Sequence, residues 1–255
     1  MHPTSLRPEE DAAFAHAVRL ATAHGASLEV VHIAGPILPG QREHFPDAQA
    51  LLDAWEPDGS DAPLDWSTVL LPAGAPATAL ALDLQRNPAD LVIMRTAART
   101  GFDRVLHGSI AQALVNDARC RLLLLPRDVT GFVDAKTGQV DVRHVLIPVK
   151  NAFLAELALE GARALCAPLT HGSFYAHLLH VGDGDEPAVP PPGPRWTVER
   201  HTADGRVGEA IIAVGARVSA DLVVLTTSGR HLLGRTLRHV LSNVRCPVLA
   251  IPEPL

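Results

Sequence analysis

Residues 89–126, ADLVIMRTAARTGFDRVLHGSIAQALVNDARCRLLLLP, form the stretch that decides the fold. The apolar runs at its two ends are typical of buried strands, and the segment between them combines a glycine-bearing loop with a helical spacing of apolar residues. Matching pieces recur in the same order in residues 220–252, ADLVVLTTSGRHLLGRTLRHVLSNVRCPVLAIP. We therefore expect one α/β unit that is used twice.

Outward from this stretch, apolar runs predict strands, and apolar residues spaced three or four apart predict helices. In the first half we expect strands at 28–33, 66–71, 90–94 and 122–125, and helices at 7–24, 76–87 and 109–118. In the second half we expect strands at 144–149, 177–181 and 196–201, helices at 152–166 and 207–218, and a closing strand, helix and strand within 221–251. Residues 35–63 read as an insertion loop with one short amphipathic piece at 45–55. Alternating strands and helices predict parallel sheets covered on both faces.

An alignment of the two halves sets the domain boundaries. Asp90 matches Asp221 and Cys120 matches Cys246, with a loop five residues shorter in the second half. The predicted units are 1–127 and 143–255, joined by a polar linker at 128–142. Because Pro3 matches Pro148, the first half begins inside its own first strand, whether or not translation naturally starts at Met1. We therefore expect a short strand at the centre of the first sheet.

Composition excludes several functional classes. The net charge is -6, and the 22 cationic residues are scattered, which argues against a nucleic-acid partner. The three cysteines form no CxxC pair, so the sequence predicts neither a disulfide framework nor a zinc site. No run of about 18 apolar residues indicates a membrane span. We expect a cytoplasmic protein.

The repeated segments carry a resemblance to a known family. They are the strand ending IPV at 147–149, the strands LEVVHI, ADLVIM and ADLVVL, and the endings RCRLLLLP and RCPVLAIP. In their order and spacing they resemble the universal stress protein family, as a tandem member over essentially the whole chain. The resemblance implies two five-stranded parallel sheets in the order 3-2-1-4-5. It also implies pairing through the last strands, 122–125 and 248–251, as an internal pseudo-dimer that can itself homodimerise.

The resemblance implies a site as well. ATP-binding members carry G-x2-G-x9-G-[ST] after the fourth strand and an aspartate after the first, where backbone N–H groups and a helix N-terminus attract phosphate. In the first half, Gly108 and Ser109 match the end of this motif, and Gly101 is kept inside the loop. The positions that depart from the motif or line the adenine pocket are Ser5 for the aspartate, Arg95 and Ala98 for the first two glycines, and Ile33 and Met94 as apolar lining.

The second half departs further from the family pattern. Its loop is shorter, Thr226 replaces the first glycine, Arg235 follows Gly234 in place of serine, and Lys150 replaces the aspartate. A lysine ammonium cannot accept a hydrogen bond from adenosine. Binding of ATP or another adenine nucleotide is therefore expected only in the first half, if at all.

Simpler readings compete with this site. Gly108 and Ser109 also fit a tight turn and a helix N-cap, and exposed arginines are commonly solvated. His177 and His180 lie three apart on a predicted strand and point to opposite faces, so that with His171 they read as core or surface residues and no metal is expected. No catalytic triad order, HExxH or Walker sequence is present, which predicts a protein that is not an enzyme.

These features predict a non-catalytic stress-response protein that acts as a nucleotide or small-ligand sensor or as a scaffold for a protein partner. Two alternatives remain open. One is a universal stress protein that binds and slowly hydrolyses ATP, with an arginine taking over phosphate contacts. The other is a ligand-free interaction module whose pockets are filled by Lys150 and the shortened loop.

Overall fold

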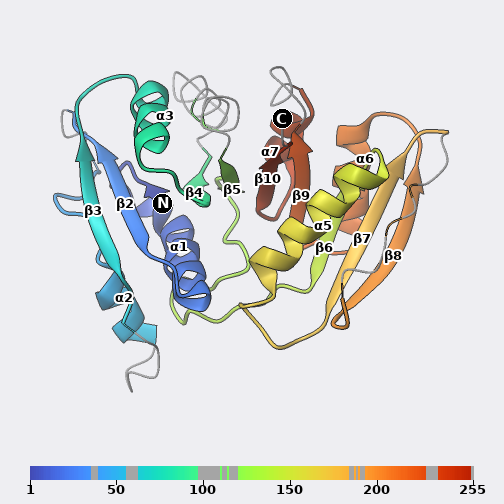
Figure 1. Cartoon of the computed structure of the whole chain (residues 1–255), viewed down its shortest axis with the longest axis horizontal. Coiled ribbons are helices and arrows are strands. Elements are labelled where there is room, and N and C mark those ends of the chain that lie inside the picture. The colour runs from blue at the N-terminus through green and yellow to red at the C-terminus, as the bar shows by residue number, and fades with distance from the viewer. Residues whose placement is uncertain are drawn as a thin grey trace.

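The computed structural model of the chain describes residues 1–35, 40–55, 63–96, 110, 114, 120–183, 187, 189, 193–227 and 235–253. The first half contains β1 (His2–Pro3), a 3-10 turn (Pro8–Glu10), α1 (Asp11–His24), β2 (Leu28–Ile33), α2 (Ala48–Trp55), β3 (Trp66–Leu71), α3 (Pro76–Arg86), β4 (Leu91–Arg95) and β5 (Arg121–Leu125), as Figure 1 shows. The second half contains β6 (His144–Val149), α5 (Ala152–Cys166), β7 (Phe174–Val181), β8 (Trp196–Ala203), α6 (Val207–Arg217), β9 (Leu222–Thr227), α7 (Arg235–Asn243) and β10 (Val248–Pro252).

Most predicted elements lie where the apolar pattern places them. The helix expected at 109–118 falls outside the described residues except for Ile110 and Leu114, which are helical and buried. The insertion at 35–63 holds a helix, α2, whose Leu52 and Trp55 are buried against the first half. None of the helices in the described ranges has the length and apolar character needed to cross a membrane.

The strands form one three-stranded and one seven-stranded sheet, which corrects the expectation of two separate five-stranded sheets. The orders are β1-β2-β3 and β4-β5-β10-β9-β6-β7-β8. The five strands of the second half follow the order 3-2-1-4-5 within the larger sheet. In the first half, β1 has two residues and pairs only with β2, because so short a strand cannot form a ladder on both sides. Two hydrogen bonds still join its start to β4, from the Met1 amine to Leu91 O (3.0 Å) and from Ile93 N to Met1 O (3.0 Å).

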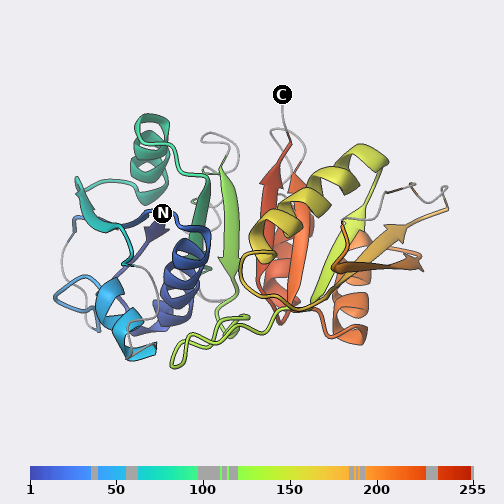
Figure 2. The same ribbon diagram turned by 60° about the horizontal axis from the view of Figure 1, so that its bottom comes forward.

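The two halves join through their last strands. β5 and β10 pair antiparallel, with Leu122 opposite Ala250, Leu123 opposite Leu249 and Leu124 opposite Val248. Figures 1 and 2 show these two strands side by side at the middle of the molecule, with the helices of each half on either side. The predicted internal pairing of the last strands is therefore confirmed. It covers two apolar strand edges that would otherwise be open to other chains.

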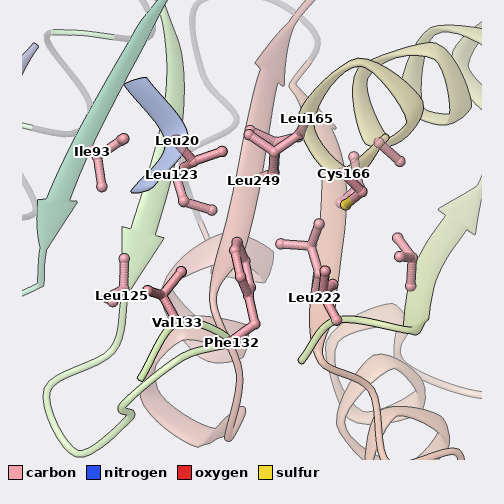
Figure 3. Close-up of a cluster of buried hydrophobic side chains, with 14 of the residues drawn as sticks. Leu20, Ile93, Leu123, Leu125, Phe132, Val133, Leu165, Cys166, Leu222 and Leu249 are labelled. Atoms are coloured by element: carbon pink, nitrogen blue, oxygen red, sulfur yellow. The ribbon is translucent and has the colours of Figure 1, made fainter. Parts of the chain in front are cut away.

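The core has two layers, one on each face of the sheets. One layer is formed with α1, α2 and α5, and the other with α3, α6 and α7. Figure 3 shows the first layer at the junction, where Leu123 and Leu249 of the paired strands lie between Leu20 of the first half and Leu165 of the second. The apolar core therefore runs without a break from one half into the other.

The segment 128–142 packs into this core, although its polar composition predicts a simple connector. Phe132 and Val133 are buried, and their backbone N–H groups donate to Nε2 of His16 on α1, at 3.1 and 3.2 Å. The Nδ1 of His16 donates to Ala12 O at 2.7 Å, so the ring must be neutral to make all three bonds. Burial lowers the pKa of His16 to about 4. The linker is thus tied to the first half by a buried histidine.

Candidate functional site

The predicted nucleotide site of the first half lies at the carboxyl ends of its strands, where open α/β sheets bind ligands. Met94 is buried in β4, and Ile33 at the end of β2 packs against the same apolar cluster. Arg95 is the last residue of β4, and Ser5 follows β1. The structure therefore places the predicted apolar lining and these two polar positions at one end of the first half.

Glu10 holds the end of β1. Its carboxylate accepts from Ser5 N (2.8 Å), from Ser5 Oγ (2.8 Å) and from Thr4 Oγ1 (2.7 Å). The 3-10 turn Pro8–Glu10 brings the carboxylate back onto the chain that has just left β1. A carboxylate is thus present near the position where the family has an aspartate, but Ser5 and Thr4 already use both of its oxygens.

Arg95 is half-buried at the end of β4. Burial lowers the pKa of its guanidinium, while the negative charges of Asp128, Glu10 and Glu9 act to raise it. Its Nε is buried and makes no hydrogen bond among the described residues. Arg95 therefore adds positive charge at this end of the sheet, in a setting that also holds Arg127 and several carboxylates.

The rest of the predicted phosphate loop cannot be placed. Ala98, Gly101, Gly108 and Ser109 lie outside the described residues. The corresponding loop of the second half, 228–234, lies outside them as well.

At the matching position in the second half, Lys150 is exposed. The alternative in which Lys150 and the shortened loop fill that pocket stays a prediction, because the loop lies outside the described residues. The next residue, Asn151, begins α5, and its side-chain oxygen accepts from Leu154 N at 2.9 Å. This end of the second sheet therefore uses its polar side chain as a helix cap.

A hollow of about 480 Å³ lies at the seam between the halves, away from the predicted nucleotide site. Its lining includes Asp90, Cys120 and Arg121 from the first half and Leu157 and Glu253 from the second. Burial raises the pKa of the Cys120 thiol to about 11, so the thiol is protonated and unreactive near neutral pH. All three cysteines are buried and free.

The structure also brings together a cluster that the sequence does not group. His144 Nδ1 lies 3.0 Å from His177 Nε2, and His177 Nδ1 lies 3.1 Å from His201 Nε2 and 3.3 Å from Glu199 Oε2. Arg217 of α6 donates to His201 Nδ1 at 3.2 Å. His177 is buried, and this burial lowers its pKa.

The sequence contained part of the signal for this cluster. Glu199 and His201 are two apart on an expected strand and so share a face. Their proximity to His177 depends on the β7–β8 register, which sets His177 opposite Glu199. Within β7, His180 lies three residues after His177 and therefore on the other face, so it does not join the cluster. The pairing register is the information that the sequence lacked.

Comparison with known proteins agrees with this architecture. The chain matches the sequence profile described as the universal stress protein family over residues 1–126 and 192–252. It is 33% identical over 54 residues to a universal stress protein of Methanocaldococcus jannaschii, a match that covers 21% of this chain and 32% of that protein. The chain therefore spans about a third of the length of this curated relative.

Two solved structures are similar over nearly the whole chain. A universal stress protein from Archaeoglobus fulgidus aligns with a TM-score of 0.65 and 17% identity, covering 98% of this chain and 94% of its own. A protein from Pseudomonas aeruginosa assigned to the same family aligns with a TM-score of 0.65 and 16% identity, covering 99% and 91%. At these identities the likeness concerns the fold alone.

The sheet order, the helices on both faces and the pairing of the two last strands define a doubly wound α/β protein made of two fused units. The profile match extends over both halves of the chain. The chain belongs to the universal stress protein family, as a tandem member.

Proposed function

We propose that this chain is a non-catalytic, cytoplasmic member of its stress-response family that acts as a ligand sensor or as a scaffold for a protein partner. We further propose that ATP binding is weak or absent and is confined to the first half, around Met94, Gly108 and Ser109. The family assignment supports the stress-response class, and the polar contacts after β1 support the weak binding.

The contacts of Glu10 carry this proposal. In the family pattern an aspartate after the first strand offers free acceptor oxygens to the nucleoside. Here Ser5 stands at that position, and its hydroxyl and N–H both donate to Glu10. A nucleoside hydroxyl would have to compete with these internal bonds, and hydrogen bonds to a charged group are the stronger kind. These internal bonds support weak binding, because they occupy much of the acceptor capacity that this position offers to adenosine.

The charges around Arg95 also support weak binding of ATP. Asp128, Glu10 and Glu9 all act on this guanidinium. A triphosphate that approaches Arg95 therefore also approaches these three carboxylates, and their repulsion offsets part of the attraction of Arg95 and of nearby Arg127. The departures from the glycine motif at Arg95 and Ala98 add a steric cost, because glycine permits the closest approach of backbone to phosphate.

Calorimetric titration with ATP and AMP tests the proposal. We expect the wild-type chain to bind with a Kd of about 1 mM or weaker, equivalent to about 4 kcal/mol of binding free energy. The double variant Ser5→Asp, Glu10→Gln restores the family carboxylate and removes the like charge of Glu10 beside it, so it should bind ATP more tightly. Micromolar binding by the wild type would contradict the proposal. Binding that survives Gly108→Asp but is lost in Gly234→Asp would contradict its assignment to the first half.

The hydrolysing alternative has Arg95 as its support, since the buried Nε of this residue lacks a hydrogen-bond partner among the described residues. Phosphate release from ATP, measured above the Ser109→Ala, Gly108→Asp variant, would favour that alternative. Native mass spectrometry of the freshly purified chain gives an independent readout. A co-purified adenine nucleotide would favour a true ATP-binding member, and its absence would favour the sensor or scaffold of another ligand or partner.

For the scaffold role, the pairing of the last strands limits which surfaces a protein partner can use. β5 and β10 already pair with each other within the chain. Another copy of this chain can therefore not use these strands for pairing, unless the two halves separate. Partner binding would have to use other surfaces, which include the exposed side chains of Leu70 on β3 and Phe153 on α5. Sedimentation of the purified chain would test whether it also homodimerises.

A further inference from the structure

The cluster of His144, His177, Glu199 and His201 lies on one face of the second-half sheet. His177 and Glu199 are register partners on β7 and β8, and His201 follows Glu199 by two residues. Leu146 is the register partner of His177 on β6, and His144 precedes it by two residues. Side chains two apart on a strand share a face. Three adjacent strands therefore direct these side chains to the same side.

The donor atoms are spaced like the ligands of a small metal ion. The Nδ1 of His177 lies 3.1 Å from His201 Nε2 and 3.3 Å from Glu199 Oε2, and one ligand atom from each residue lies within 4.8 Å of the others. A tetrahedral ion bound at about 2.0–2.1 Å needs ligand atoms about 3.3–3.4 Å apart. The two distances from His177 Nδ1 are close to that requirement.

The three hydrogen bonds that join Arg217, His201, His177 and His144 can all be made without a cation, but no proton then lies between His177 Nδ1 and Glu199 Oε2. The Arg217 guanidinium can only donate, so the neutral His201 ring must carry its proton on Nε2 and point it at His177 Nδ1. If His177 Nδ1 accepts that proton, its lone pair faces the Glu199 carboxylate. If His177 Nδ1 is protonated instead, two N–H groups face each other. A cation bound by the three lone pairs makes the contact between His177 and Glu199 favourable and replaces the hydrogen bond from Arg217 to His201.

His144 completes the arrangement as an orienting partner. When His177 uses Nδ1 as a ligand, its proton lies on Nε2 and donates to His144 Nδ1, 3.0 Å away. Metal-bound histidines commonly donate their other N–H group in this way, which fixes the ring. The His144 ring also stacks on Tyr175, with ring centroids 5.0 Å apart and planes 10° apart. The orientation of His177 is therefore set before any ion binds.

We propose that His177 Nδ1, His201 Nε2 and a Glu199 oxygen bind a divalent transition-metal ion of the Zn²⁺ type, with His144 as the orienting partner. Two imidazoles and one carboxylate suit Zn²⁺, Ni²⁺ or Cu²⁺, whereas Mg²⁺ and Ca²⁺ prefer all-oxygen sites. The Glu199 side chain is 47% exposed while His177 is 3% exposed, so the ion can enter from the Glu199 side. The site does not depend on nucleotide binding in the first half.

Zn²⁺ titration of the tag-free, full-length chain by calorimetry tests the proposal. We expect saturable binding of one ion, weakened by at least about tenfold in Glu199→Gln and in His201→Ala. The control His171→Ala removes an exposed histidine outside the cluster and should leave the affinity unchanged. Circular dichroism of each metal-free variant checks that it folds, which the exposure of Glu199 favours. The absence of one-to-one binding, or equal affinity in the Glu199→Gln, His201→Ala double variant, would overturn the proposal.

Arg217 offers a sharper test. When His201 binds the ion through Nε2, its Nδ1 carries the proton and can no longer accept from Arg217, so the exposed guanidinium must move away. Arg217→Gln removes both this competing bond and a positive charge next to the ion. We expect it to bind Zn²⁺ a few-fold more tightly than the wild type. Unchanged or weaker binding would overturn the assignment of His201 Nε2 as a ligand.

Discussion

The two halves share a sequence of elements but hold their central strands in different ways. In the first half, β1 has two residues, and it is held by Glu10 and by the Met1 hydrogen bonds to β4, while the linker docks on the neighbouring α1 through His16. In the second half, β6 has six residues and pairs along its whole length with β7. The six-residue strand is held mainly by its ladder with the next strand, whereas the two-residue strand depends on hydrogen bonds from residues outside its own sheet. The expected effects of substitution differ accordingly.

The largest effect is expected at Gly131 in the linker. Its φ is +80°, and an added Cβ would lie 2.3 Å from His16 Nε2. Gly131→Ala should therefore strain the backbone and displace the ring, at a cost of about 3 kcal/mol or more. Urea unfolding at pH 7 measures this loss. Gly25→Ala is the matched control, because Gly25 also has positive φ but open space around it, and about 1 kcal/mol is expected there. Equal losses at the two positions would show that the linker contact contributes little.

The next effect concerns pH. The pKa of His16 falls from the usual 6.5 to about 4 on folding, so the unfolded chain binds this proton first as pH decreases. The contribution of neutral His16 to the free energy of unfolding is complete above pH 6.5. It decreases as pH falls toward 4, and the loss is about 3 kcal/mol at pH 4.

Urea unfolding of the wild type and of His16→Gln over this range checks the sign and size. Other groups titrate similarly in both proteins, so the wild type should lose more stability than the variant on acidification. Parallel curves for the two proteins would contradict the assignment to His16.

A smaller effect is expected from Glu10→Gln. The variant weakens the contacts that hold Ser5 and Thr4 after β1, and we expect a loss of about 2 kcal/mol because hydrogen bonds to a charged group are involved. Thermal unfolding measures it. Glu9→Gln changes the same charge at an exposed neighbour and should leave the melting temperature nearly unchanged. A comparable drop in both variants would indicate a general charge effect instead of a specific contact.

The smallest effect is expected in the second half. Asn151 caps α5 through its bond from Leu154 N, and Asn151→Ala should cost about 1 kcal/mol. Asn151→Asp keeps an acceptor and should retain most of the stability in the same urea unfolding experiment. A loss in Asn151→Ala as large as that in Glu10→Gln would remove the proposed difference between the halves.

The sequence predicted the parts of the fold that depend on local apolar patterns. The runs ending at Leu125 and Ile251 identified the last strands, and the family resemblance correctly implied that they pair. The number of strands per sheet was not accessible, because it depends on whether Met1 to Pro3 can pair on two sides. The polar composition of 128–142 did not predict that Phe132 and Val133 are buried. Their burial depends on the contact of this segment with His16 on α1.

The candidate sites also differ in how much of each could be predicted from local sequence patterns. The positions of Met94 and Arg95 follow from the strand that contains them, so motif reasoning could place them. The role of Glu10 follows from a short turn after β1, which no pattern signalled. The histidine cluster depends on the register between β7 and β8, because His177 becomes a neighbour of Glu199 and His201 only when that register is fixed.

The antiparallel pairing of β5 and β10 within one chain has a consequence for symmetry. In an assembly of two identical subunits, every substitution appears in both subunits, so one subunit cannot change without the other. Here each half is a single copy held at a fixed effective concentration by the linker, so the pairing does not weaken on dilution. A truncated strand in one half and a histidine cluster in the other can therefore coexist in the same molecule, because neither is imposed on its counterpart.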